Sequence, residues 1–226
     1  MTVARHTISF AANIYRGGIQ YNKYEGGKRG LEVSDLFHVD LGAVAAADAD
    51  GIAESQAVAA AADFVLNGAL VSGGIVTFDT PRNVVAAWTN TAVVTVTGTD
   101  EYGETMVESS ASGTSLTGKK AFKTVTSVSS SASITGATVG TAKVLGLPFR
   151  IDAKNQVIVV SEDGKAETAS VVVVGDTTTA TATTGDVRGT VAVAGTPDGT
   201  KTYSVLMVRG SGQTKVAQFG VDQFAG

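Results

Sequence analysis

The sequence predicts an all-β protein, with a body of antiparallel strands in a β-sandwich or jelly-roll-like arrangement and an extended N-terminal arm. From residue 64 onward, short runs of Val, Ile, Thr, Phe and Tyr are separated by turns that contain glycine, a pattern typical of consecutive antiparallel strands. Several runs alternate apolar and polar residues, as strands with one buried face do. A length of 226 residues suits one large β domain or two small ones.

The residue composition of the chain changes near residue 43. Residues 1–42 mix aromatic side chains with two Gly-Gly pairs and show no sustained period, so we expect an extended arm there. Residues 43–226 form the predicted body. The body begins with an alanine-rich segment, residues 43–63. A short helix and an ordered loop are both open for it, because alanine favours a helix whereas Asp50 and Gly51 interrupt one.

Three hairpins are predicted where two β-rich runs flank a turn. They pair residues 92–97 with 104–108, residues 157–160 with 169–174, and residues 190–193 with 202–208. The second turn contains Asp163-Gly164, a dipeptide that supplies the positive φ angles of tight hairpin turns. In the last strand, Tyr203, Val205 and Met207 are expected to share one face.

The run of four valines at positions 171–174 is apolar on both faces. Strands of this kind are usually covered on both sides. We therefore expect this strand to be central in its sheet or to lie at an interface, since as an open edge it favours aggregation.

Two stretches approach known ligand-binding motifs and fail at named positions. Residues 113–120 come within one residue of a phosphate-binding loop, but Lys120 stands where a hydroxyl would bind magnesium, and the following residues favour a strand over a helix. Residues 48–51 match part of a calcium loop, but Ala46 and Ala57 occupy its first and last ligand positions. We expect a hairpin turn at the first and a solvated turn or helix cap at the second.

Candidate catalytic groups are equally incomplete. Four carboxylates gather in one predicted hairpin, namely Asp100, Glu101, Glu104 and Glu108. Glycoside hydrolysis uses paired carboxylates, but the chain holds a single tryptophan, Trp88, as a sugar platform, so a charged hairpin tip is the favoured interpretation. Ser211 lacks the flanking glycine spacing of a nucleophile elbow. We assign no catalytic residue, cofactor or metal ligand, and we expect the protein not to be an enzyme.

Composition narrows the function further. The absence of cysteine removes disulfides, thiolate metal sites and cysteine nucleophiles. The two histidines, His6 and His38, both lie in the predicted arm. A net charge of −4 argues against a nucleic-acid partner, because such binding draws on clustered Lys and Arg. No apolar stretch approaches the roughly 20 residues of a membrane-spanning helix, so no membrane association is expected.

The arm carries the candidate interface residues. They are Tyr15, Arg16, Tyr21, Tyr24 and Phe37. Tyrosine and arginine are enriched where proteins meet, so these side chains are candidate anchors for a partner. Local core packing is the alternative interpretation.

Five segments of the chain resemble small virion structural proteins of tailed bacteriophages and prophages, a group that includes head decoration (cement) proteins. They are ADADGI at 47–52, VTFDTPRNV at 76–84, TGTDEYG at 97–103, KAFKTV at 120–125 and VLGLPFRI at 144–151. The likeness spans residues 43–208 and consists of strand and turn segments without chemical residues.

This resemblance implies a non-catalytic protein, made in the cytoplasm of the bacterial host, that binds the outer surface of the phage head. Its implied partners are the major capsid protein and further copies of itself, as a dimer or trimer. Many weak contacts would add up through multivalency to stabilise the shell against packaged DNA. Two alternatives stay open: a tail, neck or fibre-associated structural protein, and a carbohydrate-binding adhesin.

Overall fold

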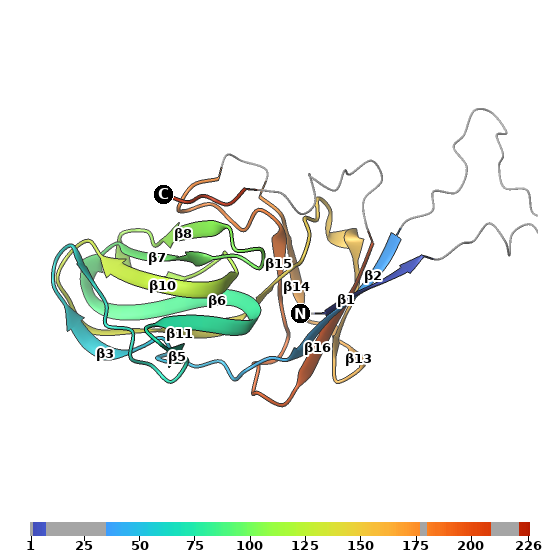
Figure 1. Ribbon diagram of the computed structural model, residues 1–226, viewed down its shortest axis with the longest axis horizontal. Helices are drawn as coiled ribbons and strands as arrows, with labels where there is room; N and C mark the ends of the chain where they lie inside the picture. The colour runs from blue at the N-terminus through green and yellow to red at the C-terminus, as the bar shows by residue number, and fades with distance from the viewer. Residues whose placement is uncertain (1, 8–34, 177–179, 209–221) are drawn as a thin grey trace, which may run out of the picture.

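The computed structural model describes residues 2–7, 35–176, 180–208 and 222–226 (Figure 1). In these residues the chain is nearly all β, and every strand pairing is antiparallel. A curled sheet forms a sandwich-like or half-barrel body, and a second, smaller sheet lies at its other end (Figure 1). The predicted all-β fold class is therefore confirmed.

The strands form two sheets. The smaller has the order β1 (Thr2–Thr7), β2 (Asp35–Ala43), β16 (Thr202–Val208), β12 (Val157–Glu162), β13 (Lys165–Ala166). The larger follows the path β14 (Val171–Val174), β15 (Gly189–Ala192), β11 (Ile134–Gly146), β6 (Ile75–Ala92), β10 (Phe122–Ser130), β7 (Val94–Thr99), β8 (Thr105–Ser109). Off this path, β3 (Ala53–Val58) pairs with β11, β4 (Ala62–Asp63) with β10, and both β5 (Val71–Ser72) and β9 (Gly113–Thr117) with β6. A 3-10 turn, η2 (Lys154–Gln156), precedes β12.

Two hydrophobic cores result, and one strand serves both. The first core fills the curl of the larger sheet and includes Trp88 and Phe122. The second lies against the smaller sheet and includes Phe149 and Tyr203. Strand β11 places Val139 in the first core and Leu145 in the second. This strand and its partner β6 therefore bridge the seam between the cores.

The structure corrects the predicted boundary of the arm. Strand β2 spans Asp35–Ala43 and pairs with β16 along its length, so residues 35–42 belong to the body. Strand β1 pairs with β2 at the edge of the same sheet. The alanine-rich segment 43–63 contains no helix; it runs as an ordered connection into β3 and β4. Buried Val44, Ile52 and Val58 anchor this extended course.

The hairpin predictions have three different outcomes. The first is confirmed, because β7 pairs with β8. In the second, the turn is confirmed, with φ of 49° at Asp163 and 74° at Gly164, but it leads into the short β13, and β14 pairs with β15 instead. The third is wrong, because β15 and β16 lie in different sheets. The expected shared face of Tyr203, Val205 and Met207 is confirmed, and it packs in the second core.

The four-valine strand β14 is an edge strand and not a central one. Val172 and Val174 pack against the second core. Val171 and Val173, on the opposite face, are 54% and 49% exposed. The prediction of a central strand is therefore wrong, and the interface alternative stays a prediction.

A buried ion pair holds the seam together. The Arg82 guanidinium, on β6, is fully buried and donates to Asp79 Oδ1 at 2.6 Å and to the carbonyl of Ala45 at 2.8 Å. Asp79 Oδ2 accepts from the Ala45 N–H at 2.9 Å. Burial lowers the pKa of Arg82, and the charge of Asp79 opposes this shift. The connection from β2 to β3, one of those that join the smaller sheet to the larger one, is thus fastened to β6 at Ala45.

We predict that Asp79→Ala destabilises the protein by about 2 kcal/mol, since removing one partner strands a buried charge, while the partial exposure of Asp79 lets water replace part of the loss. Urea unfolding followed by circular dichroism measures this change. The exposed Asp63 on β4 is the matched control, and Asp63→Ala is expected to stay within about 0.5 kcal/mol. Equal stability of the two variants would contradict the assigned role of the ion pair.

Candidate functional site

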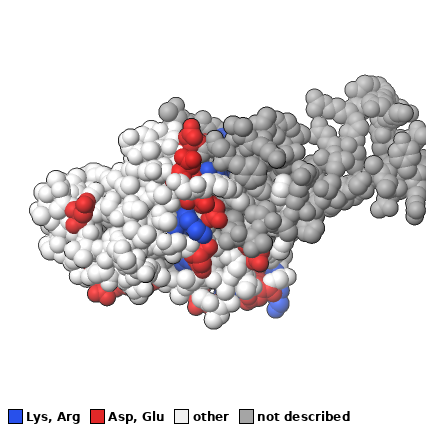
Figure 2. Space-filling view, viewed as in Figure 1, with Lys and Arg blue, Asp and Glu red and all other residues white. Residues whose placement is uncertain are grey.

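A second group of buried charged side chains lies where the β7–β8 hairpin, the turn at residues 118–121 and the segment 180–188 meet. Figure 2 shows that charged side chains on this face gather over the middle of the molecule, whereas the curled sheet is nearly free of them. The buried members of the group are Asp100, Glu108, Lys120, Asp186 and Arg188. We call them the charged cluster.

The β7–β8 turn directs Asp100 inward. Asp100 Oδ1 accepts hydrogen bonds from the backbone N–H groups of Tyr102 at 2.8 Å and Glu104 at 3.0 Å, which fixes the turn. Its Oδ2 pairs with Arg188 Nη1, and both side chains are almost fully buried. The guanidinium of Arg188 lies 4.8 Å from the ring centre of Tyr102, whose hydroxyl donates to the carbonyl of Pro148. The hairpin is therefore tied to two distant parts of the chain.

The side chain of Glu108, on β8, reaches the turn at residues 118–121, which resembles a phosphate-binding loop. Its Oε1 accepts from the N–H of Lys119 at 2.6 Å, and its Oε2 accepts from the N–H of Lys120 at 3.3 Å. Successive N–H groups of this kind are where a phosphate would bind. Here an internal carboxylate takes that position, and strand β10 follows from Phe122, as the sequence predicted. The expected hairpin is wrong, because β9 pairs with β6 and not with β10.

Lys120 and Asp186 complete the cluster through backbone contacts. Lys120 is fully buried, and its Nζ donates to the carbonyls of Val107 at 2.7 Å and Thr181 at 2.8 Å. Asp186 accepts from the N–H of Ala121 at 3.0 Å and from the N–H of Arg188 at 2.8 Å. Each charged group thus crosslinks segments that are far apart in sequence.

Burial shifts the acid–base behaviour of this cluster. It raises the pKa of Glu108 to about 7, although the N–H groups of Lys119 and Lys120 and the charge of Lys120 act in the opposite direction. Burial also raises the pKa of Asp186 and lowers that of Lys120. Glu108 is therefore an acid that titrates near neutrality, with both oxygens engaged by the backbone.

The other predicted carboxylates and motifs lie at the surface. In the carboxylate hairpin, Glu104 is exposed and Glu101 pairs with Lys123 at 3.4 Å. In the partial calcium loop, Asp48 Oδ1 accepts from the Asp50 N–H at 3.3 Å, and a hydrogen bond between the two carboxyl groups raises the pKa of Asp50. Among the described residues, no three His, Cys, Asp or Glu side chains form a group that could hold a metal ion.

Of the five candidate interface residues, Phe37 lies in the described part of the chain. Tyr15, Arg16, Tyr21 and Tyr24 lie outside the described residues. Phe37, on β2, is 9% exposed, and its ring centre lies 4.9 Å from that of Phe149 in the second core. Core packing, the alternative left open by the sequence, is therefore the role of Phe37 within this chain.

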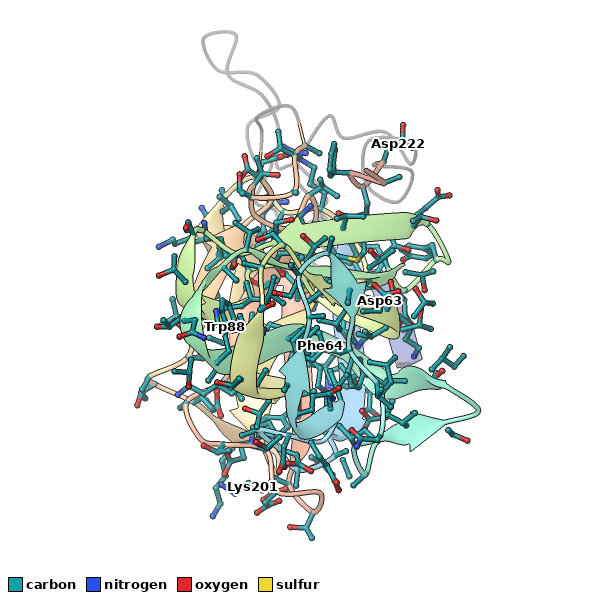
Figure 3. The ribbon with its side chains drawn as sticks, turned by 90° about the vertical axis from the view of Figure 1, so that its left-hand side faces the viewer. Asp63, Phe64, Trp88, Lys201 and Asp222 are labelled. Carbon is teal, nitrogen blue, oxygen red and sulfur yellow. The ribbon has the colours of Figure 1, made fainter. Side chains whose placement is uncertain are left out.

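Three further predictions from sequence can be placed. His38 is exposed on β2, whereas the side chain of His6 and all of Ser211 lie outside the described part of the chain. Trp88 is 6% exposed, and its indole N–H donates to the carbonyl of Gly113 at 2.9 Å, so its ring packs inside the body (Figure 3). In the parts of the chain that the structure describes, no helix has the length and apolarity needed to cross a membrane.

Sequence reasoning missed the buried cations. Lys120 precedes Ala121 and Phe122 and Arg188 follows Val187, but Lys120 also follows Lys119, and Arg82 lies between Pro81 and Asn83, so none of the three is an isolated charge in an apolar run. The partners of Lys120 and Arg188 are also distant in sequence, so the pattern does not identify those pairs, whereas Asp79 lies only three residues before Arg82.

Comparison with protein-family models, curated proteins and solved structures finds no match to this chain. The relationship to phage structural proteins therefore stays a prediction.

We predict that Glu108 makes the protein less stable as the pH rises from about 5 to 8. The folded state keeps the Glu108 proton up to a pKa of about 7, whereas the unfolded chain releases it near 4.5. Between these values the folded state binds more protons, so its stability falls with rising pH, by roughly 3 kcal/mol in total.

Glu108→Gln is expected to remove most of this fall, measured by urea unfolding at pH 5 and pH 8. The raised pKa of Asp186 acts in the same direction and remains in the variant. Glu104→Gln, an exposed change in the same hairpin, is the control and should keep the wild-type pH dependence. A fall that persists unchanged in Glu108→Gln would show that another group causes it.

Proposed function

We propose that this chain is a non-catalytic structural protein of a tailed phage particle, of the head decoration type. It would bind the major capsid protein on the outer head surface and associate with further copies of itself. In this role it would hold neighbouring capsid subunits together against the pressure of packaged DNA.

The observation that carries the proposal is where the five phage-like segments lie. Phe122 pairs with Arg82, and Arg82 with Leu145, across adjacent strands. These three residues come from three of the segments. A fourth joins them because the Tyr102 hydroxyl donates to the carbonyl of Pro148. The fifth, residues 47–52, enters the first core at Ile52. Three of the five segments thus meet where the two cores join.

The distribution of charge and apolar surface also supports a role in assembly. The cations Arg82, Lys120 and Arg188 are used inside the scaffold, where they join distant segments. Strand β14 meanwhile exposes Val171 and Val173 at the edge of the larger sheet. Sheet edges and exposed apolar side chains are where other chains add.

Copy counting on the intact particle tests the proposal. Quantitative mass spectrometry of purified virions should give a number on the order of hundreds, because a decoration protein repeats over the capsid lattice. A number of about a dozen or fewer would favour the neck or tail alternative. Absence from the particle would reject a virion role altogether.

We further predict that a chain starting at residue 35 folds but occupies the head poorly. This truncation removes Tyr15, Arg16, Tyr21 and Tyr24, which we propose as anchors to the shell, and keeps β2 in its sheet. Occupancy is measured by adding the purified protein to heads that lack it. A full-length variant with the three tyrosines changed to alanine is the matched control for loss of β1, and it should show the same defect. Full occupancy by both variants would contradict the role of the arm.

A further inference from the structure

The outer edge of β8 is covered by two separate segments. The N–H of Ser109 donates to the carbonyl of Ala182 at 2.7 Å, and the N–H of Val107 donates to the carbonyl of Phe224 at 2.8 Å. The C-terminus lies beside β8 in Figure 1, and Asp222 lies at the end of the molecule opposite Lys201 in Figure 3. Residues 222–226, the C-terminal segment, therefore extend the larger sheet at one position.

The body supplies a preformed docking site for this segment, formed by Lys120 and the β8 edge at Val107, which we call the seat. Lys120 Nζ uses two of its protons on the carbonyls of Val107 and Thr181. An ammonium has three donors. The third is available for the ring of Phe224, whose centre lies 5.7 Å from Nζ, a distance suited to a cation–π contact. Because Glu108 fixes the turn before Lys120, the seat depends on the body and not on the segment it holds.

The C-terminal segment itself is weakly held. Gln223 is 8% exposed, yet neither its Oε1 nor its Nε2 has a hydrogen-bond partner. A buried amide without partners costs about 1–3 kcal/mol. Asp222, Ala225 and Gly226 are exposed. The segment thus combines a specific ring contact with an unsatisfied side chain, which is suited to reversible docking.

We propose that residues 222–226 are exchangeable between copies of this chain, so that the C-terminal segment of one copy docks on the β8 edge of a second. The connection from Val208, residues 209–221, spans at most roughly 45 Å when extended, so a neighbouring seat is within reach. Exchange replaces each contact by an identical one, which makes it a low-cost route to association. Dense packing of copies favours the intermolecular form. This inference does not depend on the proposed phage function.

Disulfide trapping tests the exchange, because the chain has no cysteine of its own. A Cβ placed on Gly226 lies 3.7 Å from Val107 Cγ2, so the two positions are in contact and cysteines there are close enough to be tested for a disulfide. Gly226 has a φ of 106°, and because both mixed pairs contain G226C, the control pair carries the same backbone strain. The two single variants, V107C and G226C, are mixed in the full chain, with one isotopically labelled, and oxidised over a range of protein concentrations.

We expect an intermolecular 107–226 disulfide whose yield rises with concentration and exceeds that of the control pair at least tenfold. The control pair is V171C with G226C: it makes the same substitution on the opposite edge strand, where the valine is 54% exposed and random collision is therefore favoured. The double variant V107C/G226C should crosslink within one chain at high dilution. A mixed yield no higher than the control would overturn the exchange, and failure of the double variant to crosslink would overturn the docking itself.

Discussion

The burial of the Arg82 guanidinium between two hydrophobic cores is the constraint on which the rest of the structure depends. A guanidinium cannot lose its charge at ordinary pH, so it must find acceptors wherever it is buried. Its two terminal nitrogens find them in Asp79 and in the backbone of Ala45. That requirement fixes the course of the connection from β2 to β3, because Asp79 also accepts from Ala45. The two cores are therefore held in one arrangement by an electrostatic contact that apolar packing, which has no direction, does not provide.

In the charged cluster, backbone N–H donors are buried and must find an acceptor, whereas at the seam a buried cation must find one. The turn before β10 presents two successive N–H groups, and a carboxylate from the neighbouring strand satisfies them. Glu108 is held in this position although burial raises its pKa to about 7. The near match to a phosphate-binding loop therefore has a structural explanation: the backbone geometry suits an anion, and the chain supplies its own. Lys120 then connects this turn to Thr181 and to the edge of β8.

The sequence predicted those parts of the fold that depend on interactions between residues close together in the chain. The alternation of apolar and polar residues identified the β7–β8 hairpin, and Asp163-Gly164 identified a tight turn, because both depend on residues that are neighbours in the chain. Pairing across the sheets was not predictable in this way. Strand β15 pairs with β11 and β14 and not with β16, the next strand in the chain. Phe37 packs against Phe149, although it lies in a segment that was predicted to be an arm. The charged cluster was missed for the same reason, since its pairs join residues that only folding brings together.

One edge of the larger sheet is covered by other segments of the chain and the other exposes apolar side chains, and this difference has a physical consequence for assembly. The β8 edge is closed by backbone hydrogen bonds to two segments of the chain. The β14 edge instead exposes Val171 and Val173 with no charged side chain within the strand. A strand of four residues offers few backbone hydrogen bonds to an added chain, so its shortness limits uncontrolled association. An edge of this kind is weak as a single contact and becomes effective where many copies are held side by side, because their contacts then add.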